Sequence, residues 1–91
     1  MMKKKRDKLG VIYDILKIVK ENRNSIKPTP LLRKSNLSSQ RFQEYFSELL
    51  EKGFIRELEE NGGKLITLTD RGFLYLERYQ TITSFIYDFG L

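Results

Sequence analysis

The Asn-Gly pair at positions 61 and 62 is the feature that most constrains the fold of this chain. It lies within "EENGG", between the strand-like segments "FIREL" and "KLITLT". Such a pair between two strand-forming segments is the strongest short-range signal for a β-hairpin, because both residues tolerate the positive φ of a tight turn. The sequence therefore predicts a two-stranded hairpin over residues 54–69.

A helix is predicted immediately before this hairpin, within "SNLSSQRFQEYFSELLEKGF". At 100° per residue its apolar side chains fall within about 140° of arc, which is typical of a helix with one buried face. These side chains are Phe42, Tyr45, Phe46, Leu49 and Leu50. Ser38 or Ser39 is suited to cap its start and Gly53 to end it, so we expect a helix over residues 38–52.

Two more helices are expected upstream. From about Asp7 to the turn-forming run "ENRNS", apolar residues recur at steps of three and four, at Leu9, Ile12, Ile15, Leu16 and Val19. Ile26 is suited to brief pairing with a strand, and Pro30 suits the first turn of a short helix, "PLLRKS". Asn36 tolerates the left-handed conformation of a sharp reversal, so the short helix and the one after it are expected to form a helix-turn-helix.

The last predicted helix is capped by Thr69 and runs from about Asp70 to Phe89. The expected fold class is α+β: a winged helix-turn-helix of three helices and a β-hairpin wing, followed by a long C-terminal helix. We expect three regions, which are a mobile basic tail at residues 1–8, the winged helix-turn-helix domain at residues 9–69 and a dimerisation helix at residues 70–91.

Composition argues against an enzyme. The chain has no histidine and no cysteine, which removes the usual general base, the commonest zinc ligand and any disulfide. Paired carboxylate motifs and phosphate-binding glycine loops are also missing, so we expect no metal and no cofactor. Asp14 and Lys17 interrupt the apolar run that follows the basic start, so neither a signal peptide nor a membrane span is expected. We therefore expect a cytoplasmic protein.

Charge is unevenly distributed along the chain, whose formal net charge is +5. Residues 1–36 hold eleven Lys or Arg and three Asp or Glu, whereas residues 37–91 hold six and nine. The basic first third predicts contact with a polyanion. The alternative is a solubilising surface with a basic tail.

The segments "NLSSQRFQEYFSELLEKGFI" and "ITLTDRGFLYLERY", with the hairpin between them, resemble the small archaeal winged helix-turn-helix proteins. That family includes DNA-binding regulators and a ten-kilodalton chromatin-associated type with a C-terminal coiled coil. The second segment carries the Thr-(Glu/Asp)-(Lys/Arg)-Gly start that is typical of the family's final helix. The likeness spans about Leu9 to Tyr79 and implies binding to double-stranded DNA, a homodimer and an antiparallel pair of C-terminal helices.

If the helix over residues 38–52 enters a major groove, its N-terminal residues reach the base edges and its apolar face does not. Gln40, Arg41 and Gln43 are the candidates for base contact, because glutamine pairs with adenine and arginine with guanine in a bidentate manner. The alternative is that these are ordinary solvated positions.

Candidates for the DNA backbone surround this helix. They are Lys27, Arg33, Lys34, Ser38, Ser39, Arg56 and Lys64, together with Lys3, Lys4, Lys5 and Arg6 of the tail. Helix capping explains at least one of the two serines equally well.

Six glutamates oppose a close approach to phosphates, because a carboxylate repels them. They are Glu44, Glu48 and Glu51 in the predicted recognition helix, and Glu57, Glu59 and Glu60 in the wing. Only the first one or two turns of that helix are therefore expected to approach DNA closely, and the wing is expected to contribute little.

The C-terminal helix carries a coiled-coil stripe, which we call the seam. Its residues are Tyr75, Tyr79, Ile82, Ile86 and Phe89. The helix spans about 30 Å at 1.5 Å per residue, so a monomer would expose much of this stripe. We expect it to pair with a second copy; the alternative is that the tail folds back over the first helix of its own subunit.

The leading prediction is a dimeric transcriptional regulator with a sequence preference. The alternatives are an architectural chromatin protein with little sequence preference and a winged-helix module that binds protein. Tyr13, Tyr75 or Tyr79 could line a small-molecule effector cavity between the first and last helices; the alternative, which explains these tyrosines more simply, is packing in the core and the interface.

Overall fold

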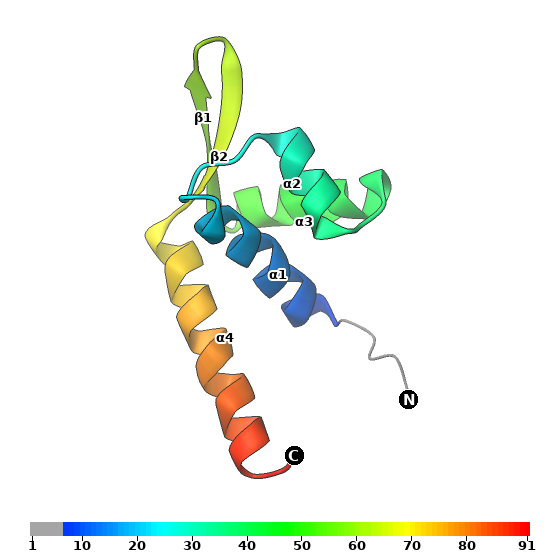
Figure 1. Ribbon diagram of the computed structural model, residues 1–91, viewed down its shortest axis with the longest axis vertical. Helices are drawn as coiled ribbons and strands as arrows, with labels where there is room; N and C mark the ends of the chain where they lie inside the picture. The colour runs from blue at the N-terminus through cyan, green and yellow to red at the C-terminus, as the bar shows by residue number, and fades with distance from the viewer. Residues whose placement is uncertain (1–6) are drawn as a thin grey trace.

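The computed structural model describes residues 7–91, and the tail candidates Lys3, Lys4, Lys5 and Arg6 lie outside the described residues. The described residues form, in order, α1 (Lys8–Glu21), α2 (Pro28–Ser35), α3 (Ser39–Glu51), β1 (Ile55–Glu60), β2 (Gly63–Leu68) and α4 (Asp70–Asp88). Figure 1 shows α1, α2 and α3 gathered below the hairpin, while α4 extends away from them. This is the predicted winged helix-turn-helix order with its long C-terminal helix.

Helix α1 begins directly after its N-cap residue, Asp7. The Asp7 carboxylate accepts a hydrogen bond from the Gly10 amide at 2.7 Å, and Lys8 is the first helical residue. The helix therefore begins one residue inside the region predicted as a basic tail. Leu9, which the spacing placed on the buried stripe, is 53% exposed because this first turn projects beyond the core.

Helix α2 begins two residues earlier than predicted, at Pro28 and not at Pro30. The first N–H groups of a helix have no acceptor within the helix, so a proline costs nothing at its start. Both prolines are tolerated in this first turn, which is why the sequence left the boundary ambiguous.

The turn between α2 and α3 follows the predicted chemistry. Asn36 adopts the left-handed conformation with φ 62°, and Ser38 caps α3 by accepting a hydrogen bond from the Arg41 amide at 3.2 Å. The buried Ser35 hydroxyl donates to the Leu32 carbonyl at 2.7 Å and so satisfies its own polar atom. These contacts end α2 and begin α3 within a three-residue turn.

One hydrophobic core holds the helices and the base of the hairpin together. Its buried residues are Val11, Ile12, Ile15, Leu16, Val19, Ile26, Leu31, Phe42, Phe46, Leu49, Ile55, Ile66, Leu68 and Leu76. Tyr45 and Leu50, predicted on the same face of α3, are only partly buried and pack against the edge of this cluster. The core thus fixes one face of α3 and leaves the other in solvent.

The wing has the register that its turn requires. Ile55 pairs with Leu68 and Glu60 with Gly63, and the turn residues Asn61 and Gly62 have φ of 51° and 78°. The predicted pairing of Ile26 is confirmed, since its amide and carbonyl both bond to Ile66 of β2. The far end of the hairpin projects away from the helices (Figure 1).

Helix α4 starts against the body and ends outside it. Thr69 caps it by accepting from the Gly72 amide, and its hydroxyl donates to the Gly53 carbonyl. The side chains from Gln80 to the C-terminus are all exposed, and the molecule measures 49 × 28 × 22 Å. Within residues 7–91, no helix is long and apolar enough to cross a membrane.

Candidate nucleic-acid interface

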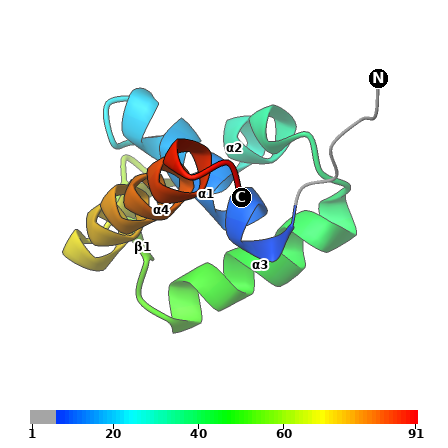
Figure 2. The ribbon, with the colours of Figure 1, turned by 90° about the horizontal axis from the view of Figure 1, so that it is seen from below.

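The exposed face of α3 carries all three candidates for base contact. Gln40, Arg41 and Gln43 are exposed, whereas Phe42 and Phe46 point into the core. Figure 2 shows α3 running along one side of the molecule, with α2 next to the end where α3 begins. The first two turns of α3 are therefore open to a large partner.

Arg41 leans along the helix toward its C-terminal end. Its guanidinium lies 5.9 Å from the centre of the Tyr45 ring, within range of a cation–π interaction. Arg41 and Tyr45 also line a cavity of about 210 Å³ together with Lys8, Glu44 and Glu48. To reach a guanine, the side chain must leave this exposed ring contact, which is worth about 0.5–1 kcal/mol.

Two cations, Arg33 and Lys34, lie in the last turn of α2, next to the short turn that leads into α3. Lys27 lies at the other end of α2, as its N-cap, next to Ile26, which pairs with β2. Lys27, Arg33 and Lys34 are all exposed, and none of them forms an ion pair within residues 7–91. Ser38 uses its hydroxyl as the cap of α3, while Ser39 is exposed in the first turn. Of the two serines, Ser39 is thus the one with a hydroxyl available for a phosphate.

The two candidate cations of the wing, Arg56 and Lys64, differ in how far their charge is offset. Lys64 lies 3.9 Å from the Glu57 carboxylate, on the neighbouring strand, so part of its charge is offset. Arg56 is exposed and pairs across the strands with Thr67. The two predicted wing contacts therefore differ, and Arg56 is the less compensated.

Glu48 has a structural role that was not predicted. Its carboxylate bonds to the ammonium of Lys8 at 2.9 Å and to that of Lys52 at 3.1 Å. Hydrogen bonds from Lys8 and then Lys52 lower the pKa of Glu48 below its ordinary value of 4.5. The pair with Lys52 could have been predicted, because the two residues are one helical turn apart. The pair with Lys8 could not, because only the fold brings α1 close to Glu48. Of the three glutamates in α3, this one is compensated.

Glu48→Gln is expected to lower the free energy of unfolding at neutral pH, because it removes the carboxylate that holds α1 to α3. A lowered pKa stabilises the fold above the ordinary value of 4.5, and this contribution is lost as the pH falls through the folded-state pKa. The variant should therefore show a weaker loss of stability on acidification than the wild type. Urea unfolding at neutral and acid pH measures both effects. Glu44→Gln, one turn earlier, is the matched control and should leave both unchanged.

The structure divides the predicted seam into two parts. The Tyr75 hydroxyl donates to the Leu9 carbonyl at 2.7 Å, and the Tyr79 ring stacks on Tyr13 of α1 with centroids 4.4 Å apart. Burial raises the pKa of Tyr75 to about 12. These two tyrosines thus pack within their own subunit.

The second part of the seam projects into solvent. Ile82, Ile86 and Phe89 are 54%, 42% and 67% exposed, and Phe85 beside them is 56% exposed. The centroids of the Phe85 and Phe89 rings lie 4.8 Å apart, so these two rings form one continuous apolar surface. The fold-back over α1 therefore accounts for the first half of the seam and leaves this distal half uncovered.

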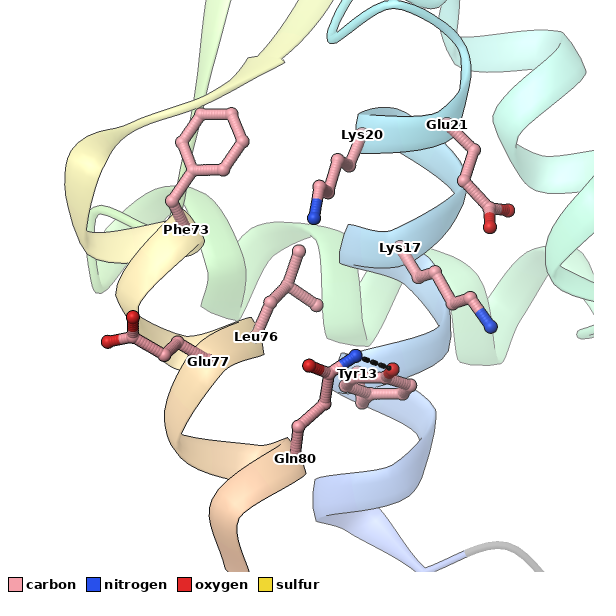
Figure 3. A pocket seen from close by; sticks show the side chains of 8 residues that line it. All are labelled: Tyr13, Lys17, Lys20, Glu21, Phe73, Leu76, Glu77 and Gln80. Carbon is pink, nitrogen blue, oxygen red and sulfur yellow. Dashed lines mark hydrogen bonds between the residues drawn. The ribbon is translucent and has the colours of Figure 1, made fainter.

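A second cavity, of about 550 Å³, lies between α1 and α4 (Figure 3). Of the three tyrosines proposed to line it, Tyr13 does so, and Tyr75 and Tyr79 do not. The Gln80 amide donates to the Tyr13 hydroxyl at 3.0 Å across its lower end. Its charged lining residues are two lysines and two glutamates, which gives it no net charge: Lys17, Lys20, Glu21 and Glu77.

Comparison with known proteins agrees with the winged helix-turn-helix fold. A family model described as winged helix-turn-helix matches residues 5–86. An uncharacterized protein of Methanocaldococcus jannaschii is 36% identical over 83 residues, which cover 91% of this chain. The chain spans only 36% of that relative's length.

Solved structures share the fold at lower identity. Sso10a-2, a DNA-binding protein from Sulfolobus solfataricus, superposes with a TM-score of 0.69 at 21% identity, over 91% of this chain and 87% of that one. The oxidized form of MarR from E. coli has a TM-score of 0.67 at 22% identity, over 76% of this chain and 50% of that one. At these identities the likeness concerns the fold.

Proposed function

The chain belongs to the winged helix-turn-helix family, and we propose that it is a dimeric transcriptional regulator that reads double-stranded DNA with α3. In a helix-turn-helix the second helix lies in the major groove with its N-terminal residues on the base edges. The observation that carries the proposal is the exposed start of α3, with Gln40, Arg41 and Gln43 in solvent. Beside it lie Arg33 and Lys34 of the last turn of α2, which form no ion pair with residues 7–91. Sso10a-2, whose fold this chain shares, is a DNA-binding protein, which supports the same reading.

Dimerisation through α4 completes the proposal. Ile82, Phe85, Ile86 and Phe89 give α4 an exposed apolar surface, which is the kind of surface that marks an interface, and a two-fold pair would cover it. Such a pair would carry two α3 helices and so match a site with two half-sites. A random-pool selection of bound duplexes tests the whole proposal, because a regulator of this kind should enrich a two-part motif.

Arg41→Ala is expected to weaken binding to the enriched duplex by about 1–3 kcal/mol and to relax discrimination at one base pair, because a bidentate contact with guanine is lost. Titration of the enriched and a random duplex measures both. Lys20→Ala, which removes one positive charge from the cavity between α1 and α4, is the control. Equal affinities for the variant and the wild type on both duplexes would remove Arg41 from the interface.

Arg33→Ala or Lys34→Ala is expected to weaken binding to all duplexes alike, because a cation that meets a phosphate carries no sequence information. Each substitution should also reduce the slope of log affinity against log salt by about one, since one fewer counterion is released. Salt titration with a random duplex measures this slope. A slope equal to that of the wild type would exclude the residue from the backbone contacts.

An architectural DNA-binding protein is the second candidate, and the exposed cations of α2 favour it. The first two turns of α3 oppose it, since they present two glutamines and the Glu44 carboxylate beside Arg41, and so carry no net positive charge. The ratio of affinities for enriched and random duplexes separates the two, because an architectural protein should give a ratio near one. Retention of no duplex at low salt would instead favour a module that binds protein.

A further inference from the structure

Glu44 lies at the centre of the face that α3 presents to solvent. At 100° per residue it follows Gln40 by one turn and lies opposite Phe46, which is packed in the core. Both Gln40 and Glu44 are exposed. Any groove that admits the first two turns of α3 must therefore accommodate the Glu44 carboxylate.

This carboxylate makes no ion pair and no side-chain hydrogen bond with the rest of residues 7–91. Two lysines on this flank, Lys8 and Lys52, are both bonded to Glu48. Glu44 borders the same small cavity as Lys8, yet the Lys8 ammonium is directed to Glu48 at 2.9 Å. Among residues 7–91, the Glu44 carboxylate therefore has no partner that would occupy its oxygens.

In a DNA groove such a group strongly discriminates between bases. Phosphates repel it, and so do the acceptors of guanine and thymine in the major groove, whereas the cytosine amino group is a donor with no acceptor beside it. Adenine offers a donor too, but its N7 acceptor lies next to that donor. We propose, on the basis of the function proposed above, that Glu44 selects cytosine at the half-site position that faces it.

The same residue explains why the reading face carries so little positive charge. Arg41 and Glu44 together contribute no net charge to the first two turns of α3, so attraction to phosphates comes from α2 and selectivity comes from α3. Glu44 therefore lowers affinity for wrong duplexes more than it lowers affinity for the right one, which is how a repulsive group creates specificity.

The test is a random-pool duplex selection with the wild-type protein, with Glu44→Gln and with Glu51→Gln. Glu51→Gln makes the same change of charge in the same helix, about 10 Å further along and outside the turns that reach the bases. We expect Glu44→Gln to lose roughly ten-fold preference for cytosine at one position of the half-site and to favour adenine there, the partner of glutamine. Glu51→Gln should keep the wild-type motif.

Two results would overturn the inference while wild-type binding persists: an unchanged motif with Glu44→Gln, or the same altered motif with Glu51→Gln. A wild-type protein that retains no duplex at low salt overturns the proposed function itself, and this inference with it. Glu44 is exposed, so circular dichroism should show both variants as folded as the wild type.

Discussion

Ile86→Asp is expected to convert the proposed dimer into a folded monomer. Ile86 lies in the exposed distal half of the seam, at 42% exposure, with Ile82 and Phe89 on the same face of α4. Burying a carboxylate in an apolar interface without a partner costs several kcal/mol, so the dissociation constant should rise by at least ~100-fold. The fold of each subunit should persist, because residues 80–91 contribute nothing to the core.

Sedimentation across a range of protein concentrations measures this effect. Ser84→Asp is the matched control, since it introduces the same charge two residues earlier, about 200° around the helix from Ile86 and on the opposite side from Ile82. A wild-type protein that sediments as a monomer at every concentration would contradict the dimer. So would an Ile86→Asp variant that associates as strongly as the wild type.

The dimer variant also bears on DNA binding. In a dimer, binding of one α3 helix to its half-site holds the second α3 helix close to the other half-site, which raises the overall affinity. Separating the two subunits removes this gain in affinity. Ile86→Asp should therefore bind a two-part site much more weakly and a single half-site almost as well as the wild type.

Gly72→Ala is expected to destabilise the fold by about 2–3 kcal/mol, although alanine is a better helix former than glycine by about 1 kcal/mol. A Cβ at Gly72 would lie 2.3 Å from the carbonyl oxygen of Phe54. That oxygen is backbone and is held by the Thr69 amide, so it has no easy way to move. Thermal unfolding should show a midpoint lower by ~10 °C or more.

Gly63→Ala is the control for this change. The same Cβ at Gly63 would meet its nearest atom, the Glu60 carbonyl oxygen, at 3.7 Å, which is an ordinary contact. The free energy of unfolding of Gly63→Ala should stay within about 1 kcal/mol of that of the wild type. A Gly72→Ala variant as stable as Gly63→Ala would show that the start of α4 is not packed this closely on the chain after α3.

Much of the fold was predictable because its signals are local. The turn residues Asn36 and Asn61 adopt the positive φ that their side chains tolerate, and the caps Ser38 and Thr69 lie where a helix must begin. Each of these preferences depends on the residue and its immediate neighbours, so no knowledge of the rest of the molecule was needed.

The candidate site was predictable only in part. The helical spacing placed Gln40, Arg41 and Gln43 opposite the apolar face, and the structure exposes all three. The spacing gave no sign that Arg41 rests on Tyr45, although the two residues are one turn apart. It also treated the glutamates of α3 as equivalent, whereas Glu48 is held by two lysines.

The sequence alone determined which segments are helix, strand or turn, and which face of each helix is apolar, because hydrophobic periodicity and capping are properties of neighbouring residues. Only the tertiary structure decided which apolar face packs against which other element. It placed Tyr75 and Tyr79 against α1 and left Ile82 and Ile86 uncovered, although all four belong to one continuous stripe. It also explained Gly72, whose missing side chain makes room for the Phe54 carbonyl. Such contacts join residues far apart in the chain, and their geometry depends on the packing of the whole core.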